Sequence, residues 1–287
     1  WNRTRAICQA NNQPGGVTLR TNTLRTTSSS LAEQLRDEGL QDVKPSKLLP
    51  GALIVRGTDR LDALPSYHAG LFQVQDASAM LVAPLCLAQP RERVLDVCAA
   101  PGGKTTHLAQ LMHDTGHIVA CDLRPGRLRL LHSHVVRLDL SSILMAVADA
   151  TKPLPVLGKF DRILVDAPCS GLGVLRHHPD IKWRKSPNDF LTLQSIQLRL
   201  LHIQHGLLAT HGTLVYSVCS YEPEETHGVV AQFLSTHPDM QLDAVDAELP
   251  QSMSQPSGTS GTLELTPEQW HTDGVFVARF RRKASTL

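Results

Sequence analysis

From about Arg93 onward, short apolar runs alternate with longer amphipathic stretches. The runs have the length of buried strands, whereas the stretches carry apolar residues at the three-and-four spacing of a helix. This alternation is typical of a mostly parallel, doubly wound α/β sheet. We expect strands at residues 94–97, 118–121, 143–147, 162–165 and 213–217, helices at 104–112, 124–138 and 189–208, and a late strand at the sheet edge over 275–280.

The first 88 residues follow a different pattern. Residues 17–24 alternate like a strand, Ser30 stands where it would cap a helix over 31–38, and residues 52–55 resemble another strand. We therefore expect a small α+β domain over residues 1–88 and a larger α/β domain over 89–287. The segment 250–261 is rich in Ser, Gly and Pro, which predicts a mobile surface loop.

Composition excludes several classes of protein. A hydrophobic content of 41% over 287 residues suits a globular core, and no apolar run approaches the roughly 18 residues that span a bilayer. The net charge of +1 gives no overall signal for nucleic-acid binding, so any basic surface must be local. Six cysteines without a CxxC pair disfavour a disulfide framework or zinc site and fit a reducing cytoplasm. The start at Trp1 indicates a trimmed chain or a fragment.

Two cysteines occupy matching positions. Cys169 lies in Asp166-Ala-Pro-Cys-Ser-Gly171 and Cys219 in Tyr216-Ser-Val-Cys-Ser220, each after an apolar run that reads as a buried strand. Because ligands collect at the carboxyl ends of the strands in an open α/β sheet, we expect both sulfurs to face one substrate. The pattern predicts a thiol-dependent group transferase. Packing explains the other four cysteines, at positions 8, 86, 98 and 121.

A third strand end carries a glycine-containing turn, Asp96-Val-Cys-Ala-Ala-Pro-Gly-Gly-Lys-Thr105. Small residues and backbone amides at a helix start suit the close approach of a nucleotide-like ligand. A P-loop is the competing interpretation, but its first glycine would fall at Cys98. The turn therefore favours a cofactor other than a nucleoside triphosphate.

Acidic residues follow the next three strands. Asp122 comes about twenty residues after the turn, where nucleoside-binding folds place an acid on the ribose hydroxyls. Asp149 is positioned to reach an adenine edge, and Asp166 ends the fourth strand. Each acid alone is explained equally well as a helix cap, but three in one crevice favour ligand binding.

These motifs together resemble the RNA cytosine-5 methyltransferase family. The resemblance runs across most of the chain and includes Gln73-Val-Gln-Asp-Ala-Ser78, Arg176-His-His-Pro-Asp-Ile-Lys-Trp183 and Asp273-Gly-Val-Phe276. It implies a class I, Rossmann-like methyltransferase domain that uses S-adenosyl-L-methionine, preceded by a small RNA-contacting domain. The expected substrate is small-subunit ribosomal RNA, with transfer RNA as the alternative, and we expect a cytoplasmic monomer without a metal.

The resemblance also assigns site residues. Asp122 would hold the ribose and Asp149 the adenine, Asp166 would lie between the methyl donor and the base, and Arg127 would assist at the cofactor edge. Cys219 would add to C6 of cytosine, and Cys169 would assist the later elimination. By analogy with DNA cytosine-5 methyltransferases, Cys169 is the rival nucleophile. The cofactor turn would consist of Cys98, Ala99, Ala100, Pro101, Gly102, Gly103 and Lys104.

Two segments depart from the family pattern. Val218 stands where the family has Thr, and Glu222-Pro-Glu-Glu-Thr226 replaces a Glu-Asn-Glu-like segment. The valine removes a hydroxyl near the nucleophile, which keeps open a contrasting class, an RNA-binding assembly factor without turnover.

Local basic clusters are the candidates for RNA contact. Arg176, Lys182, Arg184 and Lys185 surround Trp183, so this segment is either a stacking surface or a buried tryptophan with a charged rim. The other clusters are Arg3, Arg5, Arg20 and Arg25 near the start, and Arg279, Arg281, Arg282 and Lys283 near the end.

Overall fold

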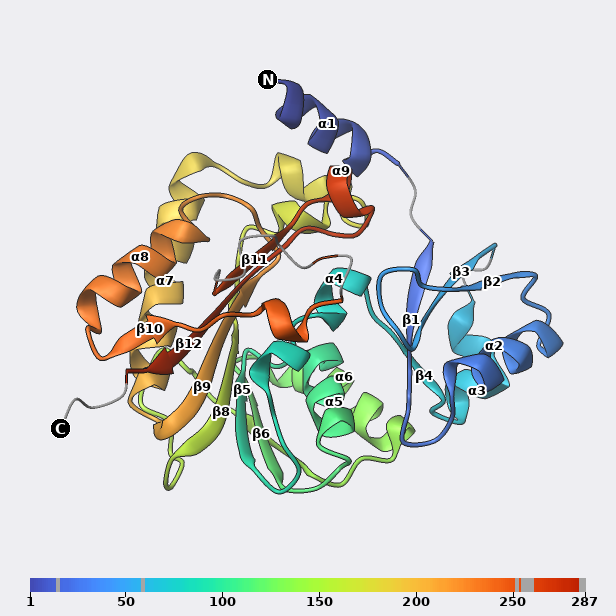
Figure 1. Ribbon diagram of the computed structural model, residues 1–287, viewed down its shortest axis with the longest axis horizontal. Helices are drawn as coiled ribbons and strands as arrows, with labels where there is room; N and C mark the ends of the chain where they lie inside the picture. The colour runs from blue at the N-terminus through green and yellow to red at the C-terminus, as the bar shows by residue number, and fades with distance from the viewer. Residues whose placement is uncertain (14–15, 58–59, 251–252, 254–260, 284–287) are drawn as a thin grey trace.

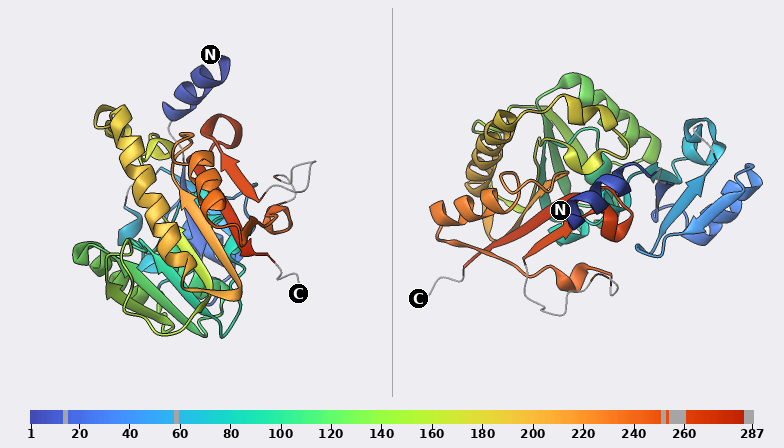
Figure 2. Two further views of the ribbon diagram at one scale, coloured as in Figure 1. Left: turned by 90° about the vertical axis from the view of Figure 1, so that its left-hand side faces the viewer. Right: turned by 90° about the horizontal axis from the view of Figure 1, so that it is seen from above.

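The computed structural model describes residues 1–13, 16–57, 60–250, 253 and 261–283, and it contains two separate β-sheets. A small sheet built from the first part of the chain lies beside a large sheet built from the rest (Figures 1 and 2). Most of the predicted loop at 250–261 lies outside the described residues. None of the described helices has the length and apolar character needed to cross a membrane.

The small sheet is antiparallel, with strand order β2-β3-β1-β4. Its core is formed by buried side chains that include Leu19, Leu31, Leu53 and Phe72. The helix α2 is capped by Thr27, which accepts the amide of Ser30, so the expectation that Ser30 is the cap was wrong. The elements are β1 (Val17–Thr21), α2 (Ser28–Asp37), β2 (Asp42–Pro45), β3 (Ala52–Arg56), η1 (Leu61–Ala63), α3 (Pro65–His68) and β4 (Phe72–Val74).

The first helix lies away from this small sheet. Helix α1 (Asn2–Asn11) runs beside α9 (Pro267–Trp270), as Figure 1 shows. Arg3 forms ion pairs of 2.9 Å with Glu264 and 3.4 Å with Glu268. The amino-terminal segment therefore packs on the end of the large domain, and the division predicted at residue 88 stays a prediction.

The large sheet has the order β10-β12-β9-β8-β5-β6-β7, with β11 paired to β12. The five strands β5 to β9 are parallel, whereas β12 runs antiparallel to β9. The predicted mostly parallel sheet is thus confirmed, but the expected edge strand was wrong because β10 and β11 both pair with β12. The strands are β5 (Arg93–Val97), β6 (His117–Asp122), β7 (Ile143–Val147), β8 (Phe160–Asp166), β9 (Leu208–Val218), β10 (Met240–Leu242), β11 (Thr262–Leu265) and β12 (Val275–Arg282).

Helices cover both faces of this sheet because alternate strand residues point to opposite sides. Val94 and Ile118 pack in one core with α5 and α6, whereas Leu95 and Val97 pack in the other with α7 and α8. The remaining elements are α4 (Ala77–Met80), η2 (Pro84–Cys86), α5 (Gly103–Leu111), α6 (Pro125–Leu138), η3 (Leu172–Val174), η4 (Pro179–Trp183), α7 (Pro187–His205), α8 (His227–Thr236) and η5 (Asp246–Glu248).

The strand order places a crevice between β5 and β8. The chain runs outward from β5 through β6 and β7, and then returns to β8 on the other side of β5. In doubly wound sheets, ligands bind at the carboxyl ends of the strands at such a reversal. The turns that follow β5, β8 and β9 all open toward this position.

Candidate active site

The turn after β5 brings backbone groups together at the start of α5. Cys98 has a φ of 62° and Gly102 a φ of 105°, both in the left-handed region. A Cβ at Gly102 would lie 2.2 Å from the Leu131 side chain, so only glycine fits here. The peptide bond between Ala100 and Pro101 is cis. The predicted turn therefore has a tightly defined backbone whose small residues leave one side open.

Asp122 contacts this turn directly. It is 4% exposed, and its carboxylate accepts the amides of Ala100 at 3.2 Å and of Arg124 at 2.9 Å. Arg127 donates to the carbonyl oxygen of Ala100 and lies 3.9 Å from the Asp122 carboxylate. The structure thus brings Asp122 and Arg127 together against the predicted cofactor turn.

Asp149 has a local role instead. Its carboxylate accepts the amide of Thr151 at 3.1 Å and the hydroxyl at 2.6 Å, and it pairs with Lys152 at 3.3 Å. The hydrogen bonds from Thr151 lower the pKa of Asp149. These contacts form a local turn, and the helix-cap interpretation is wrong for this residue because the segment between β7 and β8, all of which the structure describes, contains no helix. Its role at an adenine remains a prediction.

Lys104 and Asp166 join the cofactor turn to the cysteine turns. Their ion pair measures 2.6 Å, and the same Asp166 oxygen accepts the Ser217 hydroxyl at 2.7 Å. Burial lowers the pKa of the Lys104 ammonium, but the Asp166 carboxylate outweighs it and the net pKa is raised. A charged pair therefore lies between the turn after β5 and the end of β9.

The two predicted cysteines are in contact. The Sγ atoms of Cys169 and Cys219 lie 3.0 Å apart, and both residues are partly buried. Their turns are adjacent because β8 and β9 pair in parallel, with Asp166 opposite Ser217. The expectation of two thiols at neighbouring strand ends therefore describes the observed geometry.

The two thiols differ in acidity. The hydrogen bond with Cys219 and burial raise the pKa of the Cys169 thiol well above its ordinary value. The hydrogen bond from Cys169 lowers the pKa of the Cys219 thiol, and the Lys104 ammonium acts in the same direction. The thiolate is the reactive form of cysteine, so these shifts favour Cys219 over Cys169 as the nucleophile, and this assignment stays a prediction.

Contacts around the cysteine turns fix their spacing. Glu225 is fully buried and accepts the amide and the hydroxyl of Ser170 at 2.8 and 2.5 Å. Gly173 donates its amide to the carbonyl of Cys219 at 2.9 Å, and Gly274 donates to the Gly173 carbonyl at 2.7 Å. No pattern in the sequence indicated these supports, because they connect residues far apart in the chain.

Val218 belongs to a hydrophobic core against which Cys169 also packs. Its side chain is fully buried in the core on the α7 and α8 face of the large sheet. Its neighbour Ser217 points to Asp166, as the alternation of a strand requires. Position 218 is therefore part of the core beside the cysteine turns, and these turns are supported by Glu225 and Gly173.

A cavity of about 410 Å³ lies beside the cofactor turn. Asp96, in its wall, is fully buried, and burial raises its pKa to about 7 although Thr105 donates to it at 2.6 Å. Tyr67, Gln75 and His134 were not predicted as site residues. The cavity is lined by Tyr67, Gln73, Val74, Gln75, Ala79, Asp96, Ala99, Ala100, Pro101, Gly102, Gly103, Lys104, His134 and Asp166.

Arg20 does not belong to a surface patch. It is 4% exposed and donates to the Gly103 carbonyl at 2.5 Å and to Thr106 at 2.9 Å. Arg25 pairs with Asp139 at 2.6 Å. The predicted basic cluster near the start of the chain is therefore wrong for Arg20, which instead joins the small sheet to the cofactor turn.

The basic cluster near the end of the chain is also largely structural. Arg279 is 3% exposed and pairs with Asp243 at 2.9 Å and Glu248 at 2.8 Å. Arg281 and Arg282 pair with Asp243 and Asp239, respectively. These contacts hold β12 against its neighbours and leave Arg279 unable to contact RNA.

Among the free cysteines, Cys86 and Cys121 are buried as expected. Cys98 lies in the cofactor turn, and burial raises the pKa of its thiol to about 12. Cys8 is exposed, so packing does not explain it.

Trp183 is 83% exposed. The Lys182 ammonium lies 5.3 Å from its ring centroid, and Arg184 pairs with Asp180 at 3.3 Å. The buried interpretation is thus wrong, and the indole offers an exposed apolar face beside the Lys182 ammonium.

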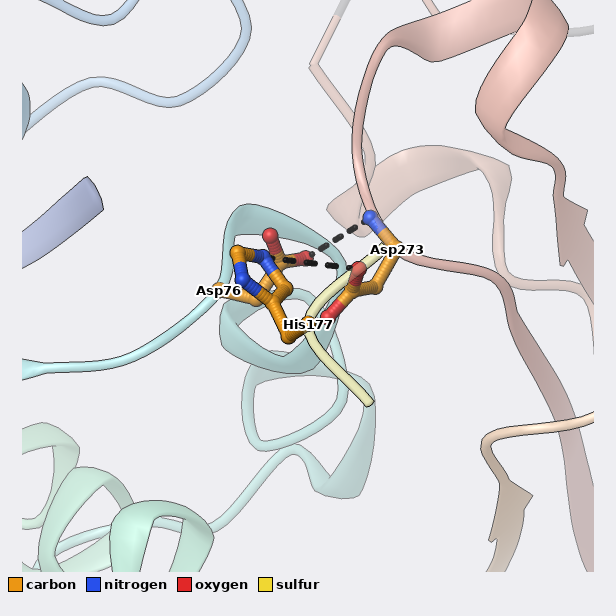
Figure 3. A group of neighbouring side chains, drawn as sticks. All are labelled: Asp76, His177 and Asp273. Atoms are coloured by element: carbon orange, nitrogen blue, oxygen red, sulfur yellow. Dashed lines mark hydrogen bonds and ion pairs between the residues drawn. The ribbon is translucent and has the colours of Figure 1, made fainter. Parts of the chain in front are cut away.

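Three side chains from distant segments meet near the cysteine turns, as Figure 3 shows: Asp76, His177 and Asp273. Asp273 donates its amide to Asp76 at 3.2 Å, and its carboxylate lies 3.6 Å from His177. Burial, followed by the neighbouring Asp76, raises the pKa of Asp273 to about 7. This contact holds three of the family-like segments together, and no motif in the sequence indicated it.

Comparison with known proteins identifies the family. A family model described as 16S rRNA methyltransferase RsmB/F matches residues 83–281. A model described as the ferredoxin-like domain of RsmF/B-like methyltransferases matches residues 2–60. Among solved structures, a methyltransferase homologue from Pyrococcus horikoshii has a TM-score of 0.82 and 29% identity, covering 98% of this chain and 91% of that one. NSun6 from the same organism has the same fold, with a TM-score of 0.86 and 22% identity over 98% of this chain and 94% of its own.

Curated relatives agree with this assignment. The probable ribosomal RNA small subunit methyltransferase B of Synechocystis is 39% identical over 97% of this chain and 63% of its own length. The human 28S rRNA (cytosine(4447)-C(5))-methyltransferase is 35% identical over 97% of this chain and 36% of its own length. The chain thus spans less than two thirds of these relatives. The resemblance found in the sequence is confirmed, and the chain belongs to the 16S rRNA methyltransferase RsmB/F family.

Proposed function

We propose that this chain transfers a methyl group from S-adenosyl-L-methionine to C5 of cytosine in ribosomal RNA, through a covalent bond between Cys219 and C6. The observation that carries this proposal is the contact between Cys169 and Cys219, 3.0 Å apart and next to the Lys104–Asp166 pair. The names of the relatives support the class of substrate.

The residues around the turn fit this cofactor. Gly102 lets the turn pack against Leu131 in a left-handed conformation, and the adjoining cavity of about 410 Å³ has the size of a small-molecule site. The segment Cys98 to Lys104 would hold the amino-acid part, and Asp122 would accept the ribose hydroxyls, with Arg127 at the edge. Asp149 remains the candidate for the adenine. When bound, S-adenosyl-L-methionine supplies an electrophilic methyl group.

The protein's own task is to activate the base. Cytosine C5 is a weak nucleophile, so a thiolate adds to C6 and pushes the electrons of the C5–C6 double bond toward C5. Cys219 performs this addition because the hydrogen bond from Cys169 lowers its pKa. Asp166 holds the N3 and N4 edge of a flipped-out cytosine, assisted by Lys104.

Elimination completes the reaction. Once C5 carries the methyl group, a water molecule accepts the C5 proton, the C5–C6 double bond forms again, and the bond between Cys219 and C6 breaks, which regenerates the thiolate. Cys169 assists by donating its S–H to the departing sulfur, 3.0 Å away in the free enzyme. A Cys169→Ala variant is therefore expected to accumulate the covalent complex with RNA, whereas normal RNA release by this variant would contradict the assignment.

The test is methyl transfer from labelled S-adenosyl-L-methionine to unmodified small-subunit ribosomal RNA and, in parallel, to bulk transfer RNA. Label at cytosine C5 in ribosomal RNA that vanishes in Cys219→Ala is the expected result. Label that persists in Cys219→Ala but vanishes in Cys169→Ala would make Cys169 the nucleophile. Label in transfer RNA alone would mean that the substrate is transfer RNA and not ribosomal RNA. Cofactor binding without transfer would favour an assembly factor.

A further inference from the structure

The two active-site thiols are close enough to react with each other. Their sulfurs lie 3.0 Å apart, and a disulfide bond of about 2.05 Å requires them to approach by only about 1 Å. All six cysteines are free in this structure.

Hydrogen bonds around the two cysteine turns keep the thiols close together. Ser170 and Ser220, which follow the two cysteines, are 3.2 Å apart at their hydroxyls, and Glu225 holds Ser170 from the other side. The amide of Gly173 donates a hydrogen bond to the Cys219 carbonyl. The two cysteines belong to one chain, so the reaction between them is intramolecular. It is entropically favoured because neither turn has to refold for the sulfurs to meet.

We propose that Cys169 and Cys219 form a covalent modification site at which a peroxide converts the two thiols into a reversible disulfide. Both residues keep part of their surface exposed, and hydrogen peroxide is among the smallest oxidants that could enter such a site. A low-pKa, accessible thiol next to a second cysteine is the arrangement typical of peroxide-sensitive sites.

The chemistry balances in two steps. The Cys219 thiolate attacks one peroxide oxygen, the O–O bond breaks, and hydroxide leaves, which a proton converts to water. Cys169 then attacks the resulting sulfenic acid of Cys219, the S–O bond breaks, and the thiol proton of Cys169 leaves with the hydroxyl as a second water. Two thiols are oxidised to one disulfide, and one peroxide is reduced to two waters.

The acidity of the pair supports these roles. The thiolate is favoured at Cys219, which attacks, whereas the proton stays on Cys169, which resolves the sulfenic acid. The disulfide would occupy the sulfur that must add to C6, so the oxidised chain would lose methyl transfer until a thiol reductant restores it.

The experiment treats the whole chain with hydrogen peroxide and then labels the remaining thiols with N-ethylmaleimide. Peptide mass spectrometry is expected to find a Cys169–Cys219 crosslink with the loss of two hydrogens, formed at a rate independent of protein concentration and removed by dithiothreitol. Exposed Cys8 reports the general reactivity of a thiol toward peroxide. Cys8→Ser serves as the control and should still form the crosslink.

Two results would overturn the inference. One is full labelling of Cys169 and Cys219 at peroxide doses that oxidise Cys8. The other is crosslinking between chains or to Cys8. In Cys169→Ser, the expected product is sulfenic or sulfinic acid at Cys219, and an unmodified Cys219 thiol would contradict its assigned role. Mass spectrometry detects the crosslink whether or not the chain transfers methyl groups, so this test does not depend on the proposed reaction. The proposed reaction is contradicted separately if the reduced chain transfers no methyl group.

Discussion

The hydroxyl of Ser170 lies 2.5 Å from one oxygen of the Glu225 carboxylate, and the other oxygen accepts the Ser170 amide at 2.8 Å. Gln197 donates to the same carboxylate at 3.1 Å. Because Ser170 directly follows Cys169 and contacts Ser220, this buried acid controls the distance between the two thiols.

Replacement of Glu225 by Gln is expected to loosen both cysteine turns. A buried hydrogen bond to a charged group contributes about 1.5 to 3 kcal/mol, and the new amide would face donors from Ser170 and Gln197. We expect the free energy of unfolding in urea to fall by about 2 kcal/mol and methyl transfer to fall with it. Glu222→Gln, on the same loop but half-buried, is the matched control. Equal stability and activity of both variants would contradict the role of Glu225.

Gly173→Ala tests the second support. An added Cβ would lie 2.4 Å from the carbonyl oxygen of Gly274 and 2.9 Å from that of Cys219, so backbone must move. The expected result is a large loss of methyl transfer with a smaller loss of thermal stability. At Gly126, in α6, the nearest atom is 3.6 Å away, and Ala there should be neutral or stabilise the helix by up to about 1 kcal/mol. Wild-type turnover by Gly173→Ala would show that the turn tolerates displacement.

The sequence predicted the parts of the fold that repeat a simple pattern. The five parallel strands and their helices were recognisable because each strand is a short apolar run, and all but the edge strand β7 are largely buried. The two cysteines were predicted to face one substrate because parallel strands end on one side of the sheet. Local patterns of this kind need no knowledge of distant contacts.

What the sequence did not predict depends on distant contacts. Arg20 looks like a surface residue by type, but the cofactor turn, more than eighty positions later, buries it. The place of β12 inside the sheet depends on β10 and β11, which are three and four residues long. Glu225 looked like part of a polar loop, and only the folded chain shows that it joins the two cysteine turns.

Trp183→Ala tests the exposed indole as an RNA-stacking surface. Stacking of a base on an aromatic ring contributes about 1 to 3 kcal/mol, so the dissociation constant for ribosomal RNA should rise between about 5-fold and 150-fold. The melting temperature should not change, because the ring is 83% exposed. Leu157→Ala, at another exposed apolar side chain, is the control, measured by filter binding. Unchanged affinity in Trp183→Ala would exclude stacking at this position.

Asp96 should make the stability of the chain depend on pH. Burial raises its pKa to about 7, against about 3.9 in the unfolded chain, so the folded state binds the proton more tightly. Its contribution to stability is therefore greatest below about pH 4 and is lost progressively up to pH 7. Asp96→Asn does not titrate, so its free energy of unfolding relative to wild type should be about 2 to 3 kcal/mol larger at pH 8 than at pH 5. Urea titrations at both pH values measure this difference, with Asp37→Asn as the exposed control. Parallel changes in wild type and Asp96→Asn would mean that the buried carboxyl is ionised throughout this range.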